Sequence, residues 1–419
     1  MKYLTKNTKK IWWGLKSFGA IHYYGNPSKK LKVIGVTGTS GKTTTATLLY
    51  KIAMALGYKT GLIGTVENLI AGEKIATNAK GPSTTPDSVT LTKLFSKMLE
   101  SGCEYVFMEV SSHALDQNRV AGVNFVGGIF TNLTQDHFDY HKNFENYFTA
   151  KKKFFNMLPA RAFALTNADS VYGLKMLKGI KANPFSYGFL GEESKVHFHG
   201  EIKKLDFHGL DLLFNQIEVE SKLLGKFNAY NLLAVWSACS LLGFDMSKVN
   251  KVLESVTPPS SRFEYFISKK GVIGVVDYAH KPDALENVIS TARGIVEEAH
   301  KGGRVISVFG CSGDKDPLKR PIMGKIGANL SDFAIFTSDN PRSEEPANIL
   351  EQMKPDLSPE EIKKIKIIVD RDEAIREVSK IAKENDIVLL MGKGHETYQD
   401  IKGVKYPWSE MDRLKKALQ

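Results

Sequence analysis

The sequence predicts an α/β protein made of two successive units, each built around a mainly parallel sheet. Short apolar runs of strand length alternate with stretches of helical apolar spacing, as in parallel sheets with crossover helices. The alternation restarts after Pro258-Pro259, which indicates a domain boundary. At 419 residues the chain also exceeds the usual size of one hydrophobic core. We therefore expect an N-terminal arm (residues 1–30), a central domain (31–257) and a C-terminal domain (258–419).

The central domain is expected to begin after the Asn26-Pro27-Ser28 turn, where proline interrupts regular structure. A more irregular, strand-leaning stretch runs from Ser186 to Ser221. Apolar runs predict strands at Leu31–Val36, Tyr105–Val110, Val126–Thr131 and Ala162–Thr166, and helical spacing predicts helices at Thr43–Leu56 and Asn228–Leu242.

The C-terminal domain repeats the pattern of a buried parallel sheet. Four apolar runs are separated by stretches of helical spacing, which predicts a Rossmann-like α/β domain. The predicted strands are Val272–Asp277, Val305–Phe309, Phe333–Thr337 and Ile387–Met391.

The composition is typical of a soluble globular protein, with 42% hydrophobic and 25% charged residues. No apolar run is long enough to cross a bilayer, and no secretory signal is visible. The three cysteines, Cys103, Cys239 and Cys311, are widely spaced and odd in number, which argues against a disulfide framework. We expect a cytoplasmic location.

The net charge of +11 is concentrated at one end of the chain, because residues 1–32 hold eight lysines and no acidic residue. This uneven distribution argues against a nucleic-acid partner. The arm also contains Trp12, Trp13 and Phe18, so it either lies at the inner face of a membrane or packs as a helix on the protein body.

A glycine-rich loop, Thr37-Gly38-Thr39-Ser40-Gly41-Lys42-Thr43-Thr44, lies between the first predicted strand and helix. Such a loop points backbone N–H groups at phosphate oxygens, and the helix N-terminus favours negative charge. Lys42 would neutralise phosphates and Thr43 would reach Mg²⁺. Val36 stands where the strict pattern has glycine. The central domain is therefore predicted to be a P-loop ATPase domain with a parallel sheet.

Two further polar segments follow predicted strands of the same domain. Glu109 ends one strand, where a carboxylate is costly to bury unless it is paired or binds a metal. The segment Thr131–His141 follows another strand and contains His137 four residues before His141, a spacing that also suits zinc. Asp136 and Asp139, with a phosphate loop upstream, favour a magnesium nucleotide site instead. Each histidine also has a purely structural interpretation.

The loop, Met108–Leu115 and Thr131–His141, taken in this order, resemble the central domain of the Mur ligase family. The similarity is greatest to the type that adds the third amino acid of the peptidoglycan stem peptide (UDP-N-acetylmuramoyl-tripeptide synthetase). The resemblance implies an ATP-dependent ligase that converts a carboxylate into an acyl phosphate and joins an amino acid to it. Peptidoglycan precursor synthesis would be its context.

The resemblance also implies roles for individual residues. Lys151 matches a lysine that the family carries as a CO₂-derived carbamate, although Lys152 and Lys153 leave a basic helix face as the alternative. Two Mg²⁺ sites are implied, with Thr43, Glu109, His137 and carbamylated Lys151 as ligands. The implied catalytic residues are Lys42, Lys151, Arg262, Glu109 and His137, and the implied ATP-binding residues are Gly38, Thr39, Ser40, Gly41, Lys42, Thr43, Thr44, Asn231, Arg262 and Asp277.

Two substrate sites are implied in the same way. The muramoyl-peptide would contact Ser83, Thr84, Thr85, Ser111, Gln117 and Arg119, and the incoming amino acid would contact Lys315, Asp339, Asn340, Pro341, Arg342, Gly392 and Glu396. The guanidinium of Arg342 suits a second carboxylate, which favours meso-diaminopimelate over lysine. Lys315 stands where the family has arginine, and Ser261 where a glycine precedes the arginine.

Residues 1–30 are too few to form the N-terminal domain with which typical members hold uridine diphosphate. The body of the protein or a partner would hold this end of the substrate, or it is not required. Two other functions remain open: another acid–amino acid ligase, such as a folylpolyglutamate synthetase-like enzyme, and a membrane-tethered, ATP-binding scaffold without catalysis.

Overall fold

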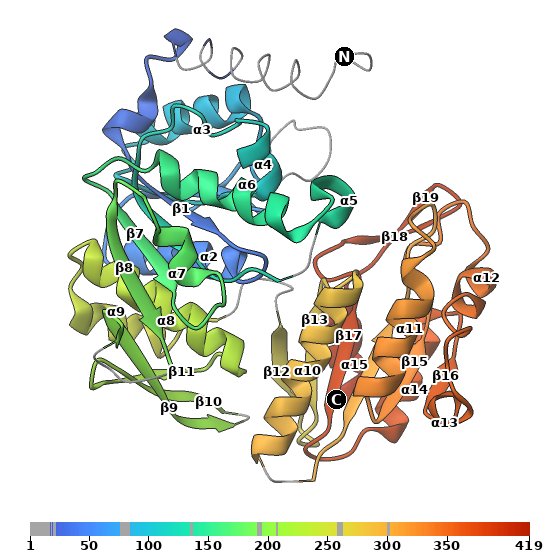
Figure 1. Cartoon of the computed structure of the whole chain (residues 1–419). Coiled ribbons are helices and arrows are strands. Elements are labelled where there is room, and N and C mark those ends of the chain that lie inside the picture. Colours follow the sequence, from blue (N-terminus) through green and yellow to red (C-terminus); the bar gives the residue numbers. More distant parts are fainter. Residues whose placement is uncertain are drawn as a thin grey trace. The chain divides into compact units, whose positions relative to one another are not determined.

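The computed structural model of the chain (Figure 1) describes residues 17, 19 and 22–419, except 76–83, 135–136, 191–194, 207, 258–262 and 300–301. It forms two compact units, the second comprising Thr257–Gln419 together with the short segments 205–209 and 224–226. Both units are α/β with mainly parallel sheets, which confirms the predicted fold class. None of the helices described combines the length and apolarity that a bilayer crossing requires.

The first unit contains an 11-stranded sheet in the order β11-β10-β9-β8-β7-β6-β1-β5-β2-β3-β4. Its central strands are parallel, whereas the pairs β2–β3, β3–β4 and β10–β11 are antiparallel. The strands are β1 (Lys32–Thr37), β2 (Thr60–Ile63), β3 (Asn68–Ile70), β4 (Glu73–Lys74), β5 (Tyr105–Glu109), β6 (Phe125–Phe130), β7 (Phe163–Asn167), β8 (Asn183–Gly188), β9 (Phe198–Asp206), β10 (Gly209–Phe214) and β11 (Ile217–Ser221).

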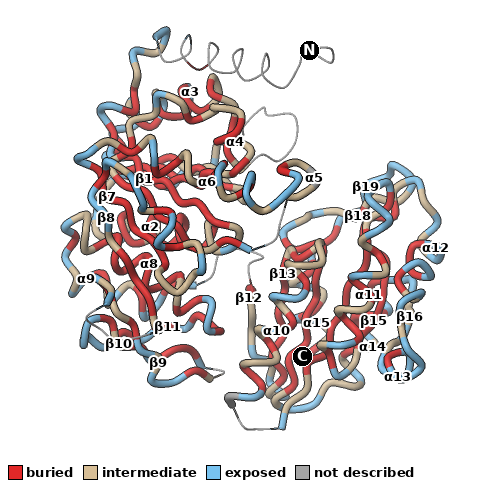
Figure 2. The backbone as a smooth tube through the Cα atoms, viewed as in Figure 1, coloured by how far each residue is buried: buried red, intermediate tan, exposed pale blue. Residues whose placement is uncertain are grey.

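Strand β1 lies between β5 and β6, and all of its residues except Lys32 are buried (Figure 2). In the register, Val36 pairs with Glu109 of β5 and Thr37 pairs with Phe130 of β6, so the carboxyl ends of the three strands meet. The helices of this unit are α2 (Lys42–Ala55), α3 (Ser88–Glu100), α4 (Ser112–Asp116), α5 (Phe138–His141), α6 (Phe144–Met157), α7 (Gly173–Leu177), α8 (Lys226–Leu241) and α9 (Met246–Leu253), preceded by the short η1 (Pro27–Lys30).

Helix α6 packs closely on β1 and β6 because both strands have glycine beneath it. A Cβ atom on Gly35 would lie 2.5 Å from Cζ of Phe154, and one on Gly128 would lie 2.9 Å from the same ring. Phe154 is fully buried by this packing. Since residues three apart share a helix face, the same packing turns Lys151 toward the sheet.

The second unit contains a six-stranded sheet in the order β12-β13-β17-β14-β15-β16, parallel except for the edge strand β12. The strands are β12 (Glu264–Ile267), β13 (Ile273–Asp277), β14 (Val305–Phe309), β15 (Phe333–Phe336), β16 (Ile365–Ile367) and β17 (Ile387–Met391), and a separate hairpin is formed by β18 (Tyr398–Ile401) and β19 (Val404–Pro407). The helices are α10 (Pro282–Ala299), α11 (Lys319–Leu330), α12 (Pro346–Glu351), α13 (Pro359–Ile362), α14 (Arg371–Ile381) and α15 (Glu410–Leu418).

A buried ion pair ties the carboxyl ends of β15 and β17 together. The guanidinium of Arg371 pairs with Glu410, and both side chains are fully buried. Arg371 also donates to the carbonyl oxygens of Ser338, two residues after β15, and of Met391, the last residue of β17. This ion pair therefore orders the edge of the sheet from which the loops of the second unit start.

Candidate active site

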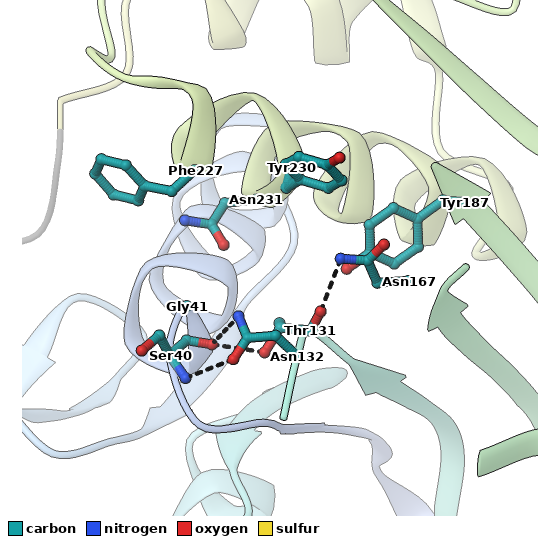
Figure 3. Close-up of a pocket in the computed structure, with 9 residues that line it drawn as sticks. All are labelled: Ser40, Gly41, Thr131, Asn132, Asn167, Tyr187, Phe227, Tyr230 and Asn231. Atoms are coloured by element: carbon teal, nitrogen blue, oxygen red, sulfur yellow. Dashed lines mark hydrogen bonds between the residues drawn. The ribbon is translucent and has the colours of Figure 1, made fainter. Parts of the chain in front are cut away.

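The glycine-rich loop between β1 and α2 is held by the segment that follows β6. Thr131 Oγ1 donates to the carbonyl of Ser40 at 2.6 Å, and the amide N of Ser40 donates to Asn132 Oδ1 at 2.9 Å (Figure 3). A Cβ atom on Gly38 would lie 1.9 Å from Thr131 Oγ1, and Gly41 has a positive φ of 84°. Both glycines are therefore required by the shape of the loop.

Two lysines converge on this loop. Lys42 Nζ donates to the carbonyls of Gly38 and Thr39, both at 2.8 Å, and Lys151 Nζ donates to the same Gly38 carbonyl at 2.7 Å. Lys151 is only 1% exposed, and its ammonium lies 4.6 Å from the ring centre of Tyr147. Two ammonium groups therefore lie at one carbonyl of the loop, which makes the loop a positively charged site for an anion.

The neighbouring lysines point elsewhere. Lys152 Nζ donates to the carbonyls of Lys175, Met176 and Lys178 at the end of α7, and burial lowers its pKa. Lys153 lies 3.9 Å from Asp116. Of the three consecutive lysines, Lys151 is therefore the one that contacts the phosphate loop, so the run is not a uniform basic helix face.

Glu109 ends β5 beside the loop and is 1% exposed. Its carboxylate accepts hydrogen bonds from the amide N of Thr65 at 2.8 Å and from Thr65 Oγ1 at 3.1 Å. No described basic side chain pairs with it. Mg²⁺ prefers oxygen ligands, and the Glu109 carboxylate and the Thr43 hydroxyl are both buried oxygen ligands of this kind. These residues therefore fit the expected metal.

Three histidines form a ring cluster next to the loop. The ring of His113 lies 4.8 Å from that of His137 and 5.5 Å from that of His141, and His141 Nε2 lies 3.0 Å from Ser112 Oγ. Among the described residues, no group of three His, Cys, Asp or Glu has the geometry of a metal site, which gives no support to the zinc alternative. Asp136 and the side chain of Asp139 lie outside what the structure describes.

The residues expected at the muramoyl-peptide form one hydrogen-bonded network. Thr85 Oγ1 donates to the Glu109 carbonyl at 2.8 Å and accepts from the Ser111 amide, while Arg119 donates to the Thr85 carbonyl and to Gln117 Oε1. Burial lowers the pKa of Arg119. Thr84 reaches the network through Thr65, at 3.0 Å between the hydroxyl oxygens. Ser83 lies outside the described residues.

A pocket of about 130 Å³ adjoins the start of α2, and Asn231 of α8 points into it toward Gly41 (Figure 3). Tyr230 on the same helix donates to Asp169 at 2.8 Å, and burial raises its pKa. Aromatic and amide side chains provide stacking and hydrogen bonding for a planar base. The lining residues are Ser40, Gly41, Thr131, Asn132, Asn167, Tyr187, Phe227, Tyr230 and Asn231, of which Asn167, Tyr187, Phe227 and Tyr230 were not named as site residues from the sequence.

In the second unit, Asp277 at the end of β13 is largely engaged in backbone contacts. Its carboxylate accepts from the amide N atoms of Phe263 and Ala279, both at 2.8 Å, and is 6% exposed. It therefore fixes the chain directly after Arg262, which itself lies outside the described residues.

The segments 339–342 and 392–396 meet at the carboxyl edge of the second sheet. Asn340 Nδ2 donates to Glu396 at 2.7 Å, and Lys393 Nζ contacts Asn340 Oδ1 and Glu396, each at 3.1 Å. Lys393 is fully buried and was not singled out from the sequence, because its importance depends on contacts with residues distant in the chain. Lys319 was missed as well: it donates to the His280 carbonyl at 2.9 Å, and burial lowers its pKa.

Asp339 lies within this edge, 2% exposed, and Oδ1 has no hydrogen-bond partner among the described residues. Burial raises the pKa of its carboxyl group. A Cβ atom on Gly392 would lie 2.9 Å from Asp339 Oδ2, which explains the glycine there. Lys315 is exposed and Arg342 is half-buried, so both can meet a ligand.

Comparison with known proteins identifies the family of the chain. The family described as the Mur ligase middle domain matches residues 36–239, and the Mur ligase, glutamate ligase domain family matches residues 261–394. A Parabacteroides distasonis protein named UDP-N-acetylmuramoyl-L-alanyl-D-glutamate–2,6-diaminopimelate ligase is 49% identical over 94% of this chain and 79% of its own length. The chain belongs to the Mur ligase family.

Solved structures agree with the Mur ligase assignment. A structure described by the same ligase name has a TM-score of 0.67 at 30% identity, covering 93% of this chain and 78% of its own. A folylpolyglutamate synthase from Thermotoga maritima has a TM-score of 0.68 at 16% identity, covering 90% of each chain, and shows the fold alone. In this Mur ligase, Glu109, the segment after β6 and the loops at 339–342 and 392–396 lie at the carboxyl ends of parallel strands of their own unit, where α/β sheets bind ligands.

Proposed function

We propose that this chain joins 2,6-diaminopimelate to UDP-N-acetylmuramoyl-L-alanyl-D-glutamate, using ATP to activate the acceptor carboxylate. The observation that carries the proposal is the 49% identity, over 94% of the chain, to a ligase named for this reaction. The loop with Arg342 supports it, since no described acidic side chain pairs with this guanidinium. A free guanidinium suits the second carboxylate of such a substrate.

In the proposed mechanism, Lys42 and the loop amides hold the ATP phosphates while the acceptor carboxylate attacks the γ-phosphorus. An acyl phosphate and ADP result. The amine of diaminopimelate then attacks the acyl carbon, a proton leaves the amine, and phosphate departs. Arg119, Thr85 and Ser111 orient the acceptor, and the family resemblance implies a role for Arg262 at the γ-phosphate. Mg²⁺ bound by Thr43 and Glu109 would supply positive charge for the transferring phosphoryl group.

We also propose that Lys151 carries a carbamate. An amine on a long side chain loses its proton more readily when burial and a second cation disfavour its charge, and only the neutral amine reacts with CO₂. The carbamate nitrogen keeps one N–H, so the hydrogen bond to the Gly38 carbonyl is compatible with it. Its new carboxylate would add an oxygen ligand beside the loop, where Thr43, Glu109 and His137 are the other proposed metal ligands.

A phosphate-release assay tests the main proposal. Wild-type protein is given ATP, Mg²⁺ and UDP-N-acetylmuramoyl-L-alanyl-D-glutamate with either meso-diaminopimelate or L-lysine. We expect phosphate release with meso-diaminopimelate and little with L-lysine. A preference for lysine would overturn the assignment of the amino acid, and release with neither would overturn the reaction itself.

The alternatives give different results in the same assay. A folylpolyglutamate synthetase-like ligase would respond to a folate and glutamate, which we expect to give no signal. A non-catalytic scaffold would bind ATP without any release that depends on an amino acid.

The basic arm lies almost entirely outside the described residues, so its contact with a membrane stays a proposal. Removal of residues 1–16 should then reduce sedimentation with anionic vesicles but not with neutral ones. Unchanged sedimentation would leave the alternative of a helix packed on the body. A partner that holds the uridine diphosphate would lower the KM of the acceptor when added.

A further inference from the structure

Two loops of the second unit are docked together at its carboxyl edge, and each carries an unpaired cation. Lys315 lies on the loop before α11, and Arg342 lies on the loop after β15. Neither side chain pairs with an acidic group among the described residues. Two unpaired cations on loops that touch each other form a site for an anionic group.

The docking between these loops is close and specific. The Gly313 amide donates to the Asn340 carbonyl at 2.9 Å, and a Cβ atom on Gly313 would lie 1.9 Å from the Pro341 carbonyl. Ser343 Oγ donates to Asp314 Oδ1 at 2.5 Å. Asp314 itself has a positive φ of 54°, a conformation that needs support from its surroundings.

Glu344 is the residue that joins these loops to the body of the unit. Its Oε1 accepts from the Asp314 amide at 2.6 Å, and its two oxygens accept from both terminal nitrogens of Arg320, each at 2.8 Å. Arg320 is 1% exposed and also donates to Gln352. The guanidinium holds the pKa of Glu344 at about 2, well below its usual value, so the link stays ionised at neutral pH.

Arg342 is also fixed from the other side. Its amide donates to the Asp400 carbonyl at 3.0 Å, and its carbonyl accepts from the Lys402 amide at 2.7 Å, which places it against the β18–β19 hairpin. Its φ of 53° is unusual for a residue with a side chain. The backbone of Arg342 is thus fully engaged, and only its side chain is available for a ligand.

We propose that Glu344, held by Arg320, is a positioning residue that sets the separation of Lys315 and Arg342 and so makes the enzyme select an amino acid with a second carboxylate. This inference rests on the proposed function. It assigns the enzyme's selectivity for the amino acid to Glu344, which acts through the loops that carry Lys315 and Arg342. Lysine lacks the second carboxylate, so its turnover does not depend on this separation. A weaker contact between Glu344 and the Asp314 amide should therefore impair turnover of meso-diaminopimelate more than turnover of lysine.

The test compares Glu344→Gln with Glu345→Gln, a matched control at the neighbouring exposed position. For Glu344→Gln we expect the KM for meso-diaminopimelate to rise by roughly tenfold, since small displacements of positioning groups have effects of this order or larger. The KM values for ATP and the acceptor, and the slow turnover of a high concentration of L-lysine, should match those of Glu345→Gln. A loss of general stability would instead lower every rate together.

Equal selectivity between meso-diaminopimelate and lysine in Glu344→Gln and Glu345→Gln would overturn the inference. If Glu344→Gln does not fold, Ser343→Ala, which removes only the hydrogen bond to Asp314, takes its place and must lower the same selectivity. If wild type and Glu345→Gln release no phosphate with meso-diaminopimelate, the proposed function fails and the inference fails with it. These outcomes are distinct because the control variant reports on the proposed function alone.

Discussion

At the scale of single residues, the first unit depends on the position of the Lys151 nitrogen. Its hydrogen bond to the Gly38 carbonyl brings a group from α6 to the loop that starts α2. The two residues are far apart in the chain, so only the fold brings them together. Whether Lys151 acts as an ammonium or as a carbamate, its removal alters the charge at the phosphate loop.

Lys151→Ala should lower kcat by at least about 100-fold, because a charged group at the transferring phosphate contributes on this order. Lys153→Ala, which loses only a 3.9 Å contact with Asp116, should retain nearly full activity. Phosphate release checks both variants. Wild type supplied with ¹³C-bicarbonate should also show a carbamate NMR signal that Lys151→Ala lacks. A fully active Lys151→Ala variant would remove this residue from the catalytic set.

A second residue-scale prediction concerns the buried pair of Arg371 and Glu410. Arg371→Met leaves the Glu410 carboxylate buried without its partner, which should lower the free energy of unfolding by about 3–5 kcal/mol. Lys363→Met breaks an exposed pair with Glu360 and should cost under about 1 kcal/mol. Urea unfolding of both variants measures the difference. Equal costs would show that burial of the first pair has no energetic consequence.

At the scale of elements, most of the buried strands could be predicted because a parallel strand covered on both faces is a continuous apolar run. The run Leu31–Val36 became β1 (Lys32–Thr37), and Val305–Phe309 became β14 with the same bounds. The β18–β19 hairpin was not predicted, since both strands are short, β18 is mostly half-buried and β19 is exposed. It nevertheless holds the backbone of Arg342.

The residues of the candidate site also differ in how far the sequence could predict them. Motif residues such as Lys42 and Asn340 could be found because their neighbours in sequence form the motif. Lys393, Glu344 and Tyr230 were not singled out, because each acts through partners that only the tertiary structure brings near. The sequence therefore indicates which groups meet a ligand better than it indicates which groups hold them in place.

The packing of α6 on β1 gives an element-scale prediction. In Gly35→Ala, the added methyl group would lie 2.5 Å from the Phe154 ring, so this ring must shift, and we expect α6 to shift with it. Overpacking of this kind costs about 1–3 kcal/mol of stability, and the displaced Lys151 should lower kcat by roughly tenfold or more. Gly294→Ala, in α10 with no atom within 4 Å, should instead stabilise the protein by about 0.5–1 kcal/mol. Thermal unfolding and phosphate release distinguish these outcomes.

At the scale of the whole molecule, the chain forms two compact units, and the proposed ligands divide between them. The phosphate loop and the Asn231 pocket belong to the first unit, whereas Arg342 and Lys393 belong to the second. Each substrate should therefore stabilise a different part of the chain. Binding to the native state slows those local openings that must release the ligand.

Hydrogen exchange measured by mass spectrometry tests this division. A non-hydrolysable ATP analogue with Mg²⁺ should slow exchange at residues 38–44 and 131–134, by up to about 100-fold at 100 times its Kd. Meso-diaminopimelate should slow exchange at residues 313–316 and 339–344, while β10 and β11 serve as an internal reference. The two exchange patterns should differ because the loops that bind each ligand belong to separate hydrogen-bond networks. Protection of residues 38–44 by meso-diaminopimelate alone would contradict the assignment of the amino acid to the second unit.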